Sequence, residues 1–197
     1  MQDDLARFVY RTVFTPDEFA RRRQTVADAI DADAVAVVPG ALSPGELHLF
    51  RQDNDFYYLC GVEVPEAFLS IQGGTGYTTL YLPGQNEGEE RSEGPRLHAD
   101  DSAGARERTG VDRVASLSEW AGDIAACPTV CLPRADRDEA ATPYFWSRPG
   151  WADAFVSELR AHFDSVRVDD LTPALRNLRM VKSEQELDVM RFAGKLT

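Results

Sequence analysis

The chain has 197 residues, 43% of them hydrophobic, and a formal net charge of -12 that results from 33 acidic and 21 basic residues. This length and composition predict one globular domain with room for a connecting segment. The negative charge argues against nucleic-acid binding, and the lack of any run near the roughly 20 apolar residues of a membrane span argues against a membrane protein.

The first predicted elements are an amphipathic helix and a buried strand. Residues 15–18, TPDE, have the pattern of a capping box with proline at the first helical position, so we expect a helix from there to about Asp31. Apolar residues recur along it at helical spacing, and the arginines at 21–23 are expected to form a solvated face. The run AVAVV at 34–38 predicts a buried strand.

A hairpin and a long loop are predicted next. Residues 68–71 and 77–82 have strand-like patterns and flank the glycine-rich segment 73–76, where a turn is expected. No Gly-Lys-Ser/Thr sequence follows these glycines, which argues against a phosphate-binding loop. Residues 83–98 are polar, glycine-rich and nearly without aliphatic side chains, so we expect a long exposed loop that could reach a partner.

The middle of the chain alternates helices with short strands. Helical patterns cover about 101–109, 116–124 and 151–159, and strand patterns cover 111–114, 129–132 and 166–168. Gly110 is expected to end the first of these helices, and Ser116 to begin the second with a capping box. Alternating helices and strands with one hairpin predict an α/β domain, in which helices flank a mixed β-sheet.

Two further helices are predicted at the end of the chain. Thr172-Pro173 is expected to cap a short helix, and residues 183–186, SEQE, to open another one. This last helix presents Leu187 and Met190, and neither a glycine cap nor a turn follows it. We therefore expect residue 197 to be a cut in a longer chain.

The residues themselves indicate no active site. Cys60, Cys127 and Cys131 are odd in number and lack a CxxC spacing, so we expect buried structural thiols in a reducing compartment and a cytoplasmic protein. The spacing of Cys127 and Cys131 within a predicted strand places both on one face. The three histidines are isolated from one another, and no HExxH or GxSxG sequence occurs, so no metal centre or nucleophile is indicated.

Two motifs resemble the aminopeptidase P family. Residues 50–61, FRQDNDFYYLCG, are similar to the signature F-R-Q-D/N-S-D-F-Y-Y-L-T-G. The matching residues, to which we assign a structural role, are Phe50, Arg51, Gln52, Asp55, Phe56, Tyr58, Leu59 and Gly61. Residues 178–193 resemble the L-R-x-x-K-S-x-x-E-[IL]-x-x-[ML]-R-x-A segment that leads into the pita-bread catalytic domain of that family. The resemblance covers about residues 15–197, and Arg22-Arg23 matches the R-R start of the family.

A third segment resembles a family loop of the form E-x-W-x-G-x-R. Glu90, Gly94 and Arg96 match it, whereas Ser92 stands where the tryptophan is usual. In the family this loop can lie at a subunit interface near a neighbouring active site. The resemblance therefore implies an interface or substrate-access loop at these four residues, and Ser92 puts the usual aromatic contact in question.

The resemblance also implies a division of the chain and a function. Residues 1–172 would be an aminopeptidase P N-terminal domain with a creatinase-like fold that contains a ribonuclease H-like motif, and residues 173–197 the linker and first helix of an absent catalytic domain. The intact protein would be a Xaa-Pro aminopeptidase, a metallopeptidase (hydrolase) that removes the residue before proline. Its two divalent metal ions, expected to be manganese, would be held beyond residue 197.

On this interpretation the chain is inactive alone and contains no catalytic or metal-binding residue. It would shape access to the active site and help to build a homo-oligomer, and its partners would be its own pita-bread domain and peptides with proline in second position. Two alternatives stay open: the N-terminal domain of a prolidase- or creatinase-type enzyme, or a stand-alone module that binds peptides or proteins. The sequence after residue 197 would distinguish them.

Overall fold

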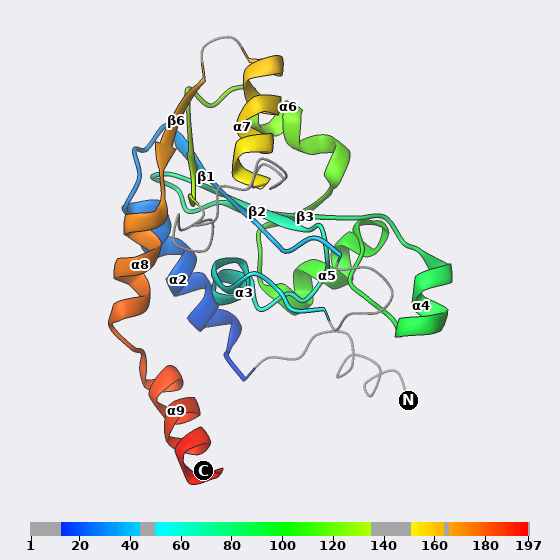
Figure 1. Cartoon of the computed structure of the whole chain (residues 1–197), viewed down its shortest axis with the longest axis vertical. Helices are drawn as coiled ribbons and strands as arrows, with labels where there is room; N and C mark the ends of the chain where they lie inside the picture. Colours follow the sequence, from blue (N-terminus) through cyan, green and yellow to red (C-terminus); the bar gives the residue numbers. More distant parts are fainter. Residues whose placement is uncertain (1–12, 44–49, 135–150, 164–165, 197) are drawn as a thin grey trace, which may run out of the picture.

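The protein is an α/β domain built on one mixed β-sheet. A computed structural model describes residues 13–43, 50–134, 151–163 and 166–196, with the side chains of 151–154 excepted. The strands are β1 (Ala34–Pro39), β2 (Phe68–Gln72), β3 (Thr78–Leu82), β4 (Arg113–Ser116), β5 (Thr129–Leu132) and β6 (Arg167–Asp170). They form a six-stranded sheet in the order β4-β3-β2-β1-β5-β6 (Figure 1).

Helices flank this sheet, as predicted. The α-helices are α2 (Pro16–Asp28), α3 (Asn54–Cys60), α4 (Glu87–Glu93), α5 (Ser102–Thr109), α6 (Trp120–Ile124), α7 (Trp151–His162), α8 (Thr172–Met180) and α9 (Glu184–Leu196). Two single 3-10 turns, η1 (Ala99–Asp101) and η2 (Leu117–Glu119), precede α5 and α6. None of the helices in the described ranges is long and apolar enough to cross a membrane.

The sheet is mixed because strand direction changes along the chain. The predicted hairpin is confirmed: β2 pairs antiparallel with β3 and with β1, while β4, β5 and β6 each pair parallel to a neighbour. The turn between β2 and β3 contains Gly74 and Gly76 at φ of 68° and 70°, a conformation that favours glycine. β5 matches its predicted range and β1 extends one residue beyond it, to Pro39, whereas β4 and β6 begin later than predicted, at the first residues that pair with their neighbours.

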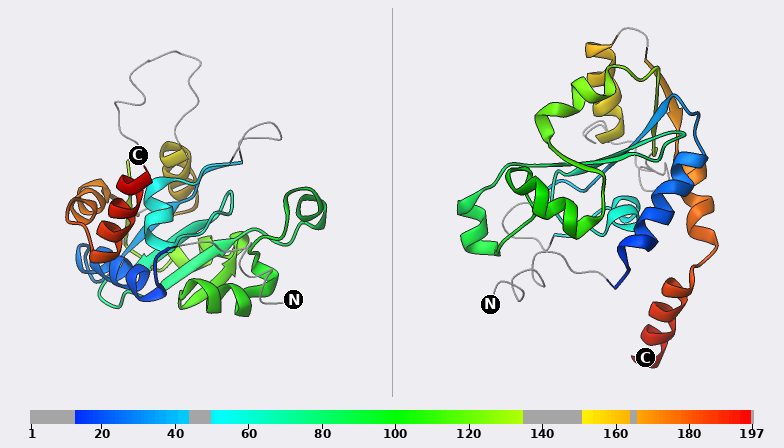
Figure 2. Two further views of the ribbon diagram at one scale, coloured as in Figure 1. Left: turned by 90° about the horizontal axis from the view of Figure 1, so that it is seen from below. Right: turned by 180° about the vertical axis from the view of Figure 1, so that it is seen from behind.

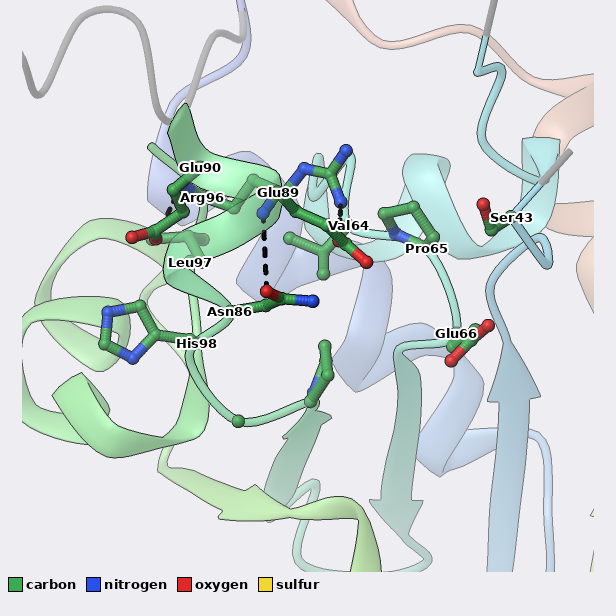
Figure 3. Close-up of a pocket in the computed structure, with 12 residues that line it drawn as sticks. Ser43, Val64, Pro65, Glu66, Asn86, Glu89, Glu90, Arg96, Leu97 and His98 are labelled. Carbon is green, nitrogen blue, oxygen red and sulfur yellow. Dashed lines mark hydrogen bonds and ion pairs between the residues drawn. The ribbon is translucent and has the colours of Figure 1, made fainter. Parts of the chain in front are cut away.

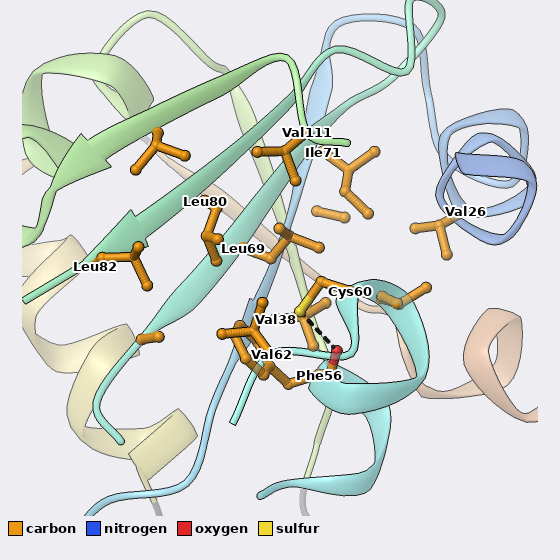
Figure 4. Close-up of a cluster of buried hydrophobic side chains, with 14 of the residues drawn as sticks. Val26, Val38, Phe56, Cys60, Val62, Leu69, Ile71, Leu80, Leu82 and Val111 are labelled. Atoms are coloured by element: carbon orange, nitrogen blue, oxygen red, sulfur yellow. Dashed lines mark hydrogen bonds between the residues drawn. The ribbon is translucent and has the colours of Figure 1, made fainter. Parts of the chain in front are cut away.

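The central strand β1 divides the core into two clusters, one on each face of the sheet. Ala34, Ala36 and Val38 belong to the larger cluster, which includes side chains of α2, α3, α5 and α8 (Figure 4). Val35 and Val37 alternate with them and contact the smaller cluster, under α6 and α7. This alternation is the expected consequence of the two-residue period of a strand. Figure 2 shows the same layers from two further sides.

The cysteines do not share a face, contrary to the prediction. Cys131 lies in the larger cluster, whereas Cys127 packs against the smaller one. The prediction failed because Cys127 precedes β5, which begins at Thr129, so the strand period does not extend to it. None of the three cysteines forms a disulfide, and burial raises the thiol pKa of Cys60 to about 12 and of Cys131 to about 11. These two thiols are therefore poor nucleophiles at neutral pH.

Helix α2 begins as predicted but forms only half of a capping box. The hydroxyl of Thr15 accepts the Glu18 N–H at 3.3 Å. The Glu18 side chain does not return to the Thr15 N–H, which donates instead to the side chain of Gln185 at 3.0 Å. The helix ends at Asp28, short of the predicted Asp31.

The two last helices are confirmed, with one difference in capping. Ser183 begins α9 with a complete capping box, because its hydroxyl accepts the Glu186 N–H at 3.2 Å and its own N–H donates to the Glu186 carboxylate at 2.9 Å. Thr172 does not cap α8; its hydroxyl accepts the Arg134 N–H at 2.8 Å. Met190 is exposed as predicted, whereas Leu187 is half-buried.

The segment predicted as an exposed loop, 83–98, contains the helix α4. The helix is exposed as predicted, since none of its residues is buried, but Leu97 after it is buried and the expectation of a loop throughout is wrong. Asn86 starts the helix by accepting the N–H groups of Gly88 and Glu89 at 3.1 and 3.3 Å. A helix that is polar all round has no hydrophobic period, which is why the sequence pattern did not indicate it.

The end of α3 supplies the first testable prediction. Gly61 ends this helix at a φ of 68°, where a side chain is strained. We expect Gly61→Ala to lower the free energy of unfolding by about 1 kcal/mol. Gly122, inside α6, is a matched control: an added Cβ meets nothing within 4 Å, so Gly122→Ala should stabilise by about 0.5 to 1 kcal/mol. Urea denaturation of both variants checks the opposite signs; equal effects would contradict the assigned role of Gly61.

Candidate functional site

The family-like motif at residues 50–61 forms a hub centred on Gln52. Its side-chain oxygen accepts the N–H groups of Ala41 and Asp53 at 2.6 and 2.8 Å, and its amide nitrogen donates to the Val64 carbonyl at 2.9 Å. These bonds join the loop after β1, the start of α3 and the segment before β2. Gln52 is only 6% exposed, so its three bonds satisfy backbone groups that water does not reach easily.

The rest of the motif begins, fills and ends α3. The carboxylate of Asp53 accepts the N–H groups of Asp55 and Phe56 at 2.9 and 3.0 Å and so caps the start of the helix. Phe56 and Leu59 are fully buried in the larger core cluster. The other motif positions are Phe50, which is half-buried, Arg51, which is exposed, and Asp55 and Tyr58, which contact α8 and α9.

A pocket of about 220 Å³ opens beside the hub, at the edge of the sheet where β1 and β3 end (Figure 3). One wall is the segment before β2, including Val64 and Glu66, and the other is α4 with the residues after it. Glu66 has a φ of 63°, unusual for a residue other than glycine, and its N–H donates to Ala41 O at 2.9 Å. Such backbone strain is found most often at functional sites.

Acidic side chains and one arginine determine the charge of the pocket wall. Arg96 donates to the Glu89 carboxylate at 2.9 Å and also forms an ion pair with Glu93. The Arg96 N–H donates to Glu90 at 3.4 Å, and Gln85 donates to the same carboxylate at 2.9 Å. The hydrogen bond from Gln85 is the main reason that the pKa of Glu90 is lowered, so this carboxylate is ionised at neutral pH.

Of the four predicted loop residues, the structure therefore places two in the pocket wall and two outside it. Glu90 and Arg96 line the pocket. Ser92 lies on the exposed side of α4, where its hydroxyl donates to the Glu89 carbonyl at 3.0 Å, and Gly94 ends the helix at a φ of 94°. Within the described ranges, no group of three His, Cys, Asp or Glu side chains could hold a metal ion. The arrangement can bind or position a molecule through hydrogen bonds.

A second polar centre lies on the other side of α3, where two arginines of α2 are buried. Arg22 is 0% and Arg23 3% exposed, so the predicted solvated arginine face is wrong except for Arg21. Arg22 donates to the Tyr58 carbonyl at 2.9 Å and Arg23 to the Leu59 carbonyl at 3.2 Å. These carbonyls belong to the last turn of α3, which lacks further helical donors, so the arginines complete the helix end.

The environment of Arg22 neutralises and encloses its guanidinium. Its Nε lies 3.0 Å from the Glu18 carboxylate, and its Cζ lies 4.2 and 4.0 Å from the ring centroids of Phe14 and Tyr58. Burial alone would raise the pKa of Glu18. Hydrogen bonds from Arg21 and Ser183 and the charge of Arg22 together bring this pKa below its ordinary value of 4.5.

The start of α9 completes this centre. The Glu186 carboxylate accepts the Ser183 N–H at 2.9 Å and the Tyr58 hydroxyl at 3.4 Å, and it lies 3.9 Å from Arg22 Nη2. We call Glu18, Arg22, Tyr58, Ser183 and Glu186 the Arg22 junction. The junction joins three stretches that lie far apart in the sequence: the R-R pair, the tyrosines of the 50–61 motif, and the SEQE segment.

Two of these three motifs, the R-R pair and the 50–61 motif, also lie within a match to a known family. Residues 19–127 match the family described as "Aminopeptidase P, N-terminal domain". The chain belongs to this family. The match accounts for more than half of the sequence and includes both the hub at Gln52 and the pocket.

Relatives of this aminopeptidase P N-terminal domain are longer proteins. The chain is 31% identical over 162 residues to Xaa-Pro aminopeptidase 3 of mouse, which covers 76% of this chain and 30% of the mouse protein. It is 24% identical over 194 residues to the Xaa-Pro aminopeptidase of Haemophilus influenzae, covering 95% and 42% of the two chains. The chain thus spans less than half the length of these relatives.

Solved structures share the fold. The low-pH form of E. coli aminopeptidase P has a TM-score of 0.72 with 24% identity, and the match covers 93% of this chain and 43% of that one. A zinc-substituted form of the same enzyme in complex with product gives a TM-score of 0.73 over the same shares. These likenesses confirm the predicted α/β architecture with its mixed sheet.

Sequence reasoning missed the roles of the polar residues that organise the site. Gln52 was noted as a motif residue without its bonding role, and Asn86 was not singled out at all. Glu18 and Arg22 are four residues apart, a spacing that favours an ion pair on a helix, but nothing in the spacing reveals that the pair is buried. The motif match to the R-R start was the available signal that Arg22 differs from a surface arginine.

Gln52 provides a test of the hub. Gln52→Ala removes one acceptor and one donor and leaves one buried and two partly buried backbone groups without their partners, so we expect the free energy of unfolding to fall by about 2 kcal/mol. Hydrogen exchange at Ala41 and Asp53 should increase more than exchange in β5. The control is Gln85→Ala, at an exposed position, which should cost less than about 1 kcal/mol. Similar losses in both variants would exclude a special role for Gln52.

The lowered pKa of Glu18 predicts a pH dependence of stability. A carboxylate whose pKa is lower in the folded than in the unfolded state stabilises fully above about pH 4.5, and this contribution disappears as pH falls through the folded pKa. We therefore expect Glu18→Gln to cost about 2 to 3 kcal/mol at pH 7, and the difference from the wild type to shrink below pH 4.5.

Denaturant titrations at pH 7, 5 and 3.5 measure this difference, with Glu87→Gln as control. Glu87 forms an exposed ion pair with Arg91, so its replacement should change stability by less than about 0.5 kcal/mol at any pH. A cost of Glu18→Gln that does not depend on pH would contradict the assignment.

Proposed function

We propose that residues 1–172 are the non-catalytic N-terminal domain of a metal-dependent Xaa-Pro aminopeptidase, and that residues 173–197 are the linker and first helix of its catalytic domain. The family membership and the partial coverage of longer Xaa-Pro aminopeptidases are the observations that carry this proposal. The named relatives favour this enzyme over a prolidase- or creatinase-type enzyme. The intact protein would then remove an N-terminal residue that precedes proline.

The exposed apolar face of α9 supports the proposal. No residue of this helix is buried, and Phe192 and Leu196 are 64% and 73% exposed. Just before it, Met180 and Val181 are 70% and 81% exposed. Figure 1 shows α9 extending away from the sheet. Large apolar side chains gathered on one exposed element mark a surface that a partner covers, and in this proposal the partner is the pita-bread domain.

The metal chemistry would belong to that following domain. Two divalent ions, which we propose to be manganese, would supply an activated water and polarise the peptide carbonyl. The contribution of this chain would be to limit access to the active site and to help build a homo-oligomer. The pocket beside Gln52 and α4, with Glu90 and Arg96, is the proposed access or interface element, and Ser92 supplies a hydroxyl where an aromatic contact would otherwise be made. Two buried thiols, Cys60 and Cys131, and the absence of a disulfide among the three cysteines fit a cytoplasmic location.

The activity of two proteins tests the proposal: the 197-residue chain, and the product of its gene with all sequence that follows residue 197. Both are incubated with Mn²⁺ and a peptide that has proline in second position. We expect cleavage by the longer protein only, and its loss after chelation of the metal. Metal-dependent cleavage by the 197-residue chain, or failure of the longer protein to cleave, would contradict the proposed function.

Phe192 tests whether a following domain covers α9. In the 197-residue chain, Phe192→Ser should change the free energy of unfolding by less than about 0.5 kcal/mol, because the side chain is exposed. In the longer protein the same change should cost about 2 kcal/mol or more. Arg191→Ser, at the neighbouring exposed position, should be nearly neutral in both. Equal, small effects of Phe192→Ser in the two proteins would argue against coverage of α9.

A further inference from the structure

Helix α9 is joined to the rest of the domain by polar contacts of its first turn. Because none of its residues is buried, packing contributes little to its direction. Gln185 forms two hydrogen bonds with Thr15, which donates its N–H at 3.0 Å and accepts from the side-chain amide at 2.9 Å. The next residue, Glu186, reaches the Arg22 junction. The direction of the helix therefore depends on a few directional bonds.

Glu186 contacts a cation that is itself held in place. The Arg22 guanidinium is fixed by Glu18, by the Tyr58 carbonyl and by the ring of Tyr58. Its remaining nitrogen, Nη2, has no hydrogen-bond partner within the described residues, and it lies 3.9 Å from the carboxylate of Glu186. The Glu186 side chain is 12% exposed, so water screens this attraction only partly.

The segment between α8 and α9 is suited to bend when these bonds break. Val181 ends α8 in an extended conformation, with φ of -93° and ψ of 114°, and it is 81% exposed. The end of α8 itself is tied to α3, because Arg179 donates to the Asp55 carboxylate at 2.6 Å. A pivot at residues 181–183 would therefore move α9 without moving α8.

We propose that Glu186, Arg22 and Tyr58 form an electrostatic latch that fixes the direction of α9, and that α9 pivots about residues 181–183 when the latch is open. The latch is a positioning device, since none of its members needs to touch a substrate. Loss of the Glu186 charge opens the latch, while Glu18 still neutralises Arg22, so the domain stays folded. That the latch also sets the orientation of a following catalytic domain rests on the proposed function.

Distances between two spin labels measure the direction of α9 in the 197-residue chain. The labels are placed at the exposed positions Glu107→Cys in α5 and Lys195→Cys in α9. Cys127→Ser removes the half-buried native thiol, and the two other cysteines are buried. Neither the catalytic domain nor a peptide is needed, so this experiment can fail independently of the proposed function.

The decisive variant is Glu186→Gln, because glutamine keeps the capping box with Ser183 and so preserves the helix while it removes the charge. We expect a narrow distance distribution in the labelled parent and a roughly twofold broader one in Glu186→Gln. Asp188→Asn, which removes an exposed charge that pairs with Arg191 on the same helix, should leave the distribution unchanged. Circular dichroism checks that helix content is equal in all three proteins.

Three outcomes would overturn the latch. One is a parent distribution that is already as broad as that of Glu186→Gln, since α9 would then have no fixed direction. Another is a distribution in Glu186→Gln as narrow as that of the parent, since contacts other than the charge of Glu186 would then hold the helix. Equal broadening by Asp188→Asn would also overturn it, because the effect would not be specific to the junction.

Discussion

Burial of the Arg22 guanidinium is the constraint on which the arrangement of three distant segments depends. An arginine with no exposed surface would cost several kcal/mol if it were unpaired, so the fold must supply partners for its charge. Glu18 supplies the charge, the last turn of α3 supplies a carbonyl at Tyr58, and aromatic rings cover the guanidinium plane. In return, Arg22 supplies a donor that the end of α3 lacks. The helix α3, the family motif within it and the start of α9 are thereby positioned by one side chain.

One wall of the pocket is also positioned by a single buried polar side chain, which here is neutral. Gln52 satisfies backbone atoms of three segments, and these segments form the edge of the sheet beside which the pocket opens. The opposite wall, α4, has no core of its own and is held by its cap and by carboxylates that pair with Arg96. The wall that Gln52 holds is thus tied to the core, whereas the position of α4 depends on its cap and on ion pairs. This contrast fits an access element, whose outer wall can change sequence without loss of the fold.

Elements that depend on local interactions could be predicted from the sequence, whereas roles that depend on contacts between distant residues could not. β1, the hairpin and α5 were predicted because apolar patterns and glycines act locally, and the hub was located through its resemblance to a family. Burial of Arg22 was not predictable, because its partners on α3 and α9 come from residues far along the chain. α4 lacks an apolar period, and Cys127 was placed on the wrong face because it lies outside the strand. Asn86 and Glu186 acquire their roles only through tertiary contacts.

We propose that this chain is one domain of a longer metalloenzyme, and the intact mass and metal content of the natively expressed protein test this proposal most directly. We expect a mass at least about twice the 21.9 kDa of this chain, because the chain spans 30% and 42% of two relatives. We also expect about two divalent ions per subunit of the natively expressed protein. A native mass near 21.9 kDa without bound metal would contradict the account and would favour a stand-alone binding module.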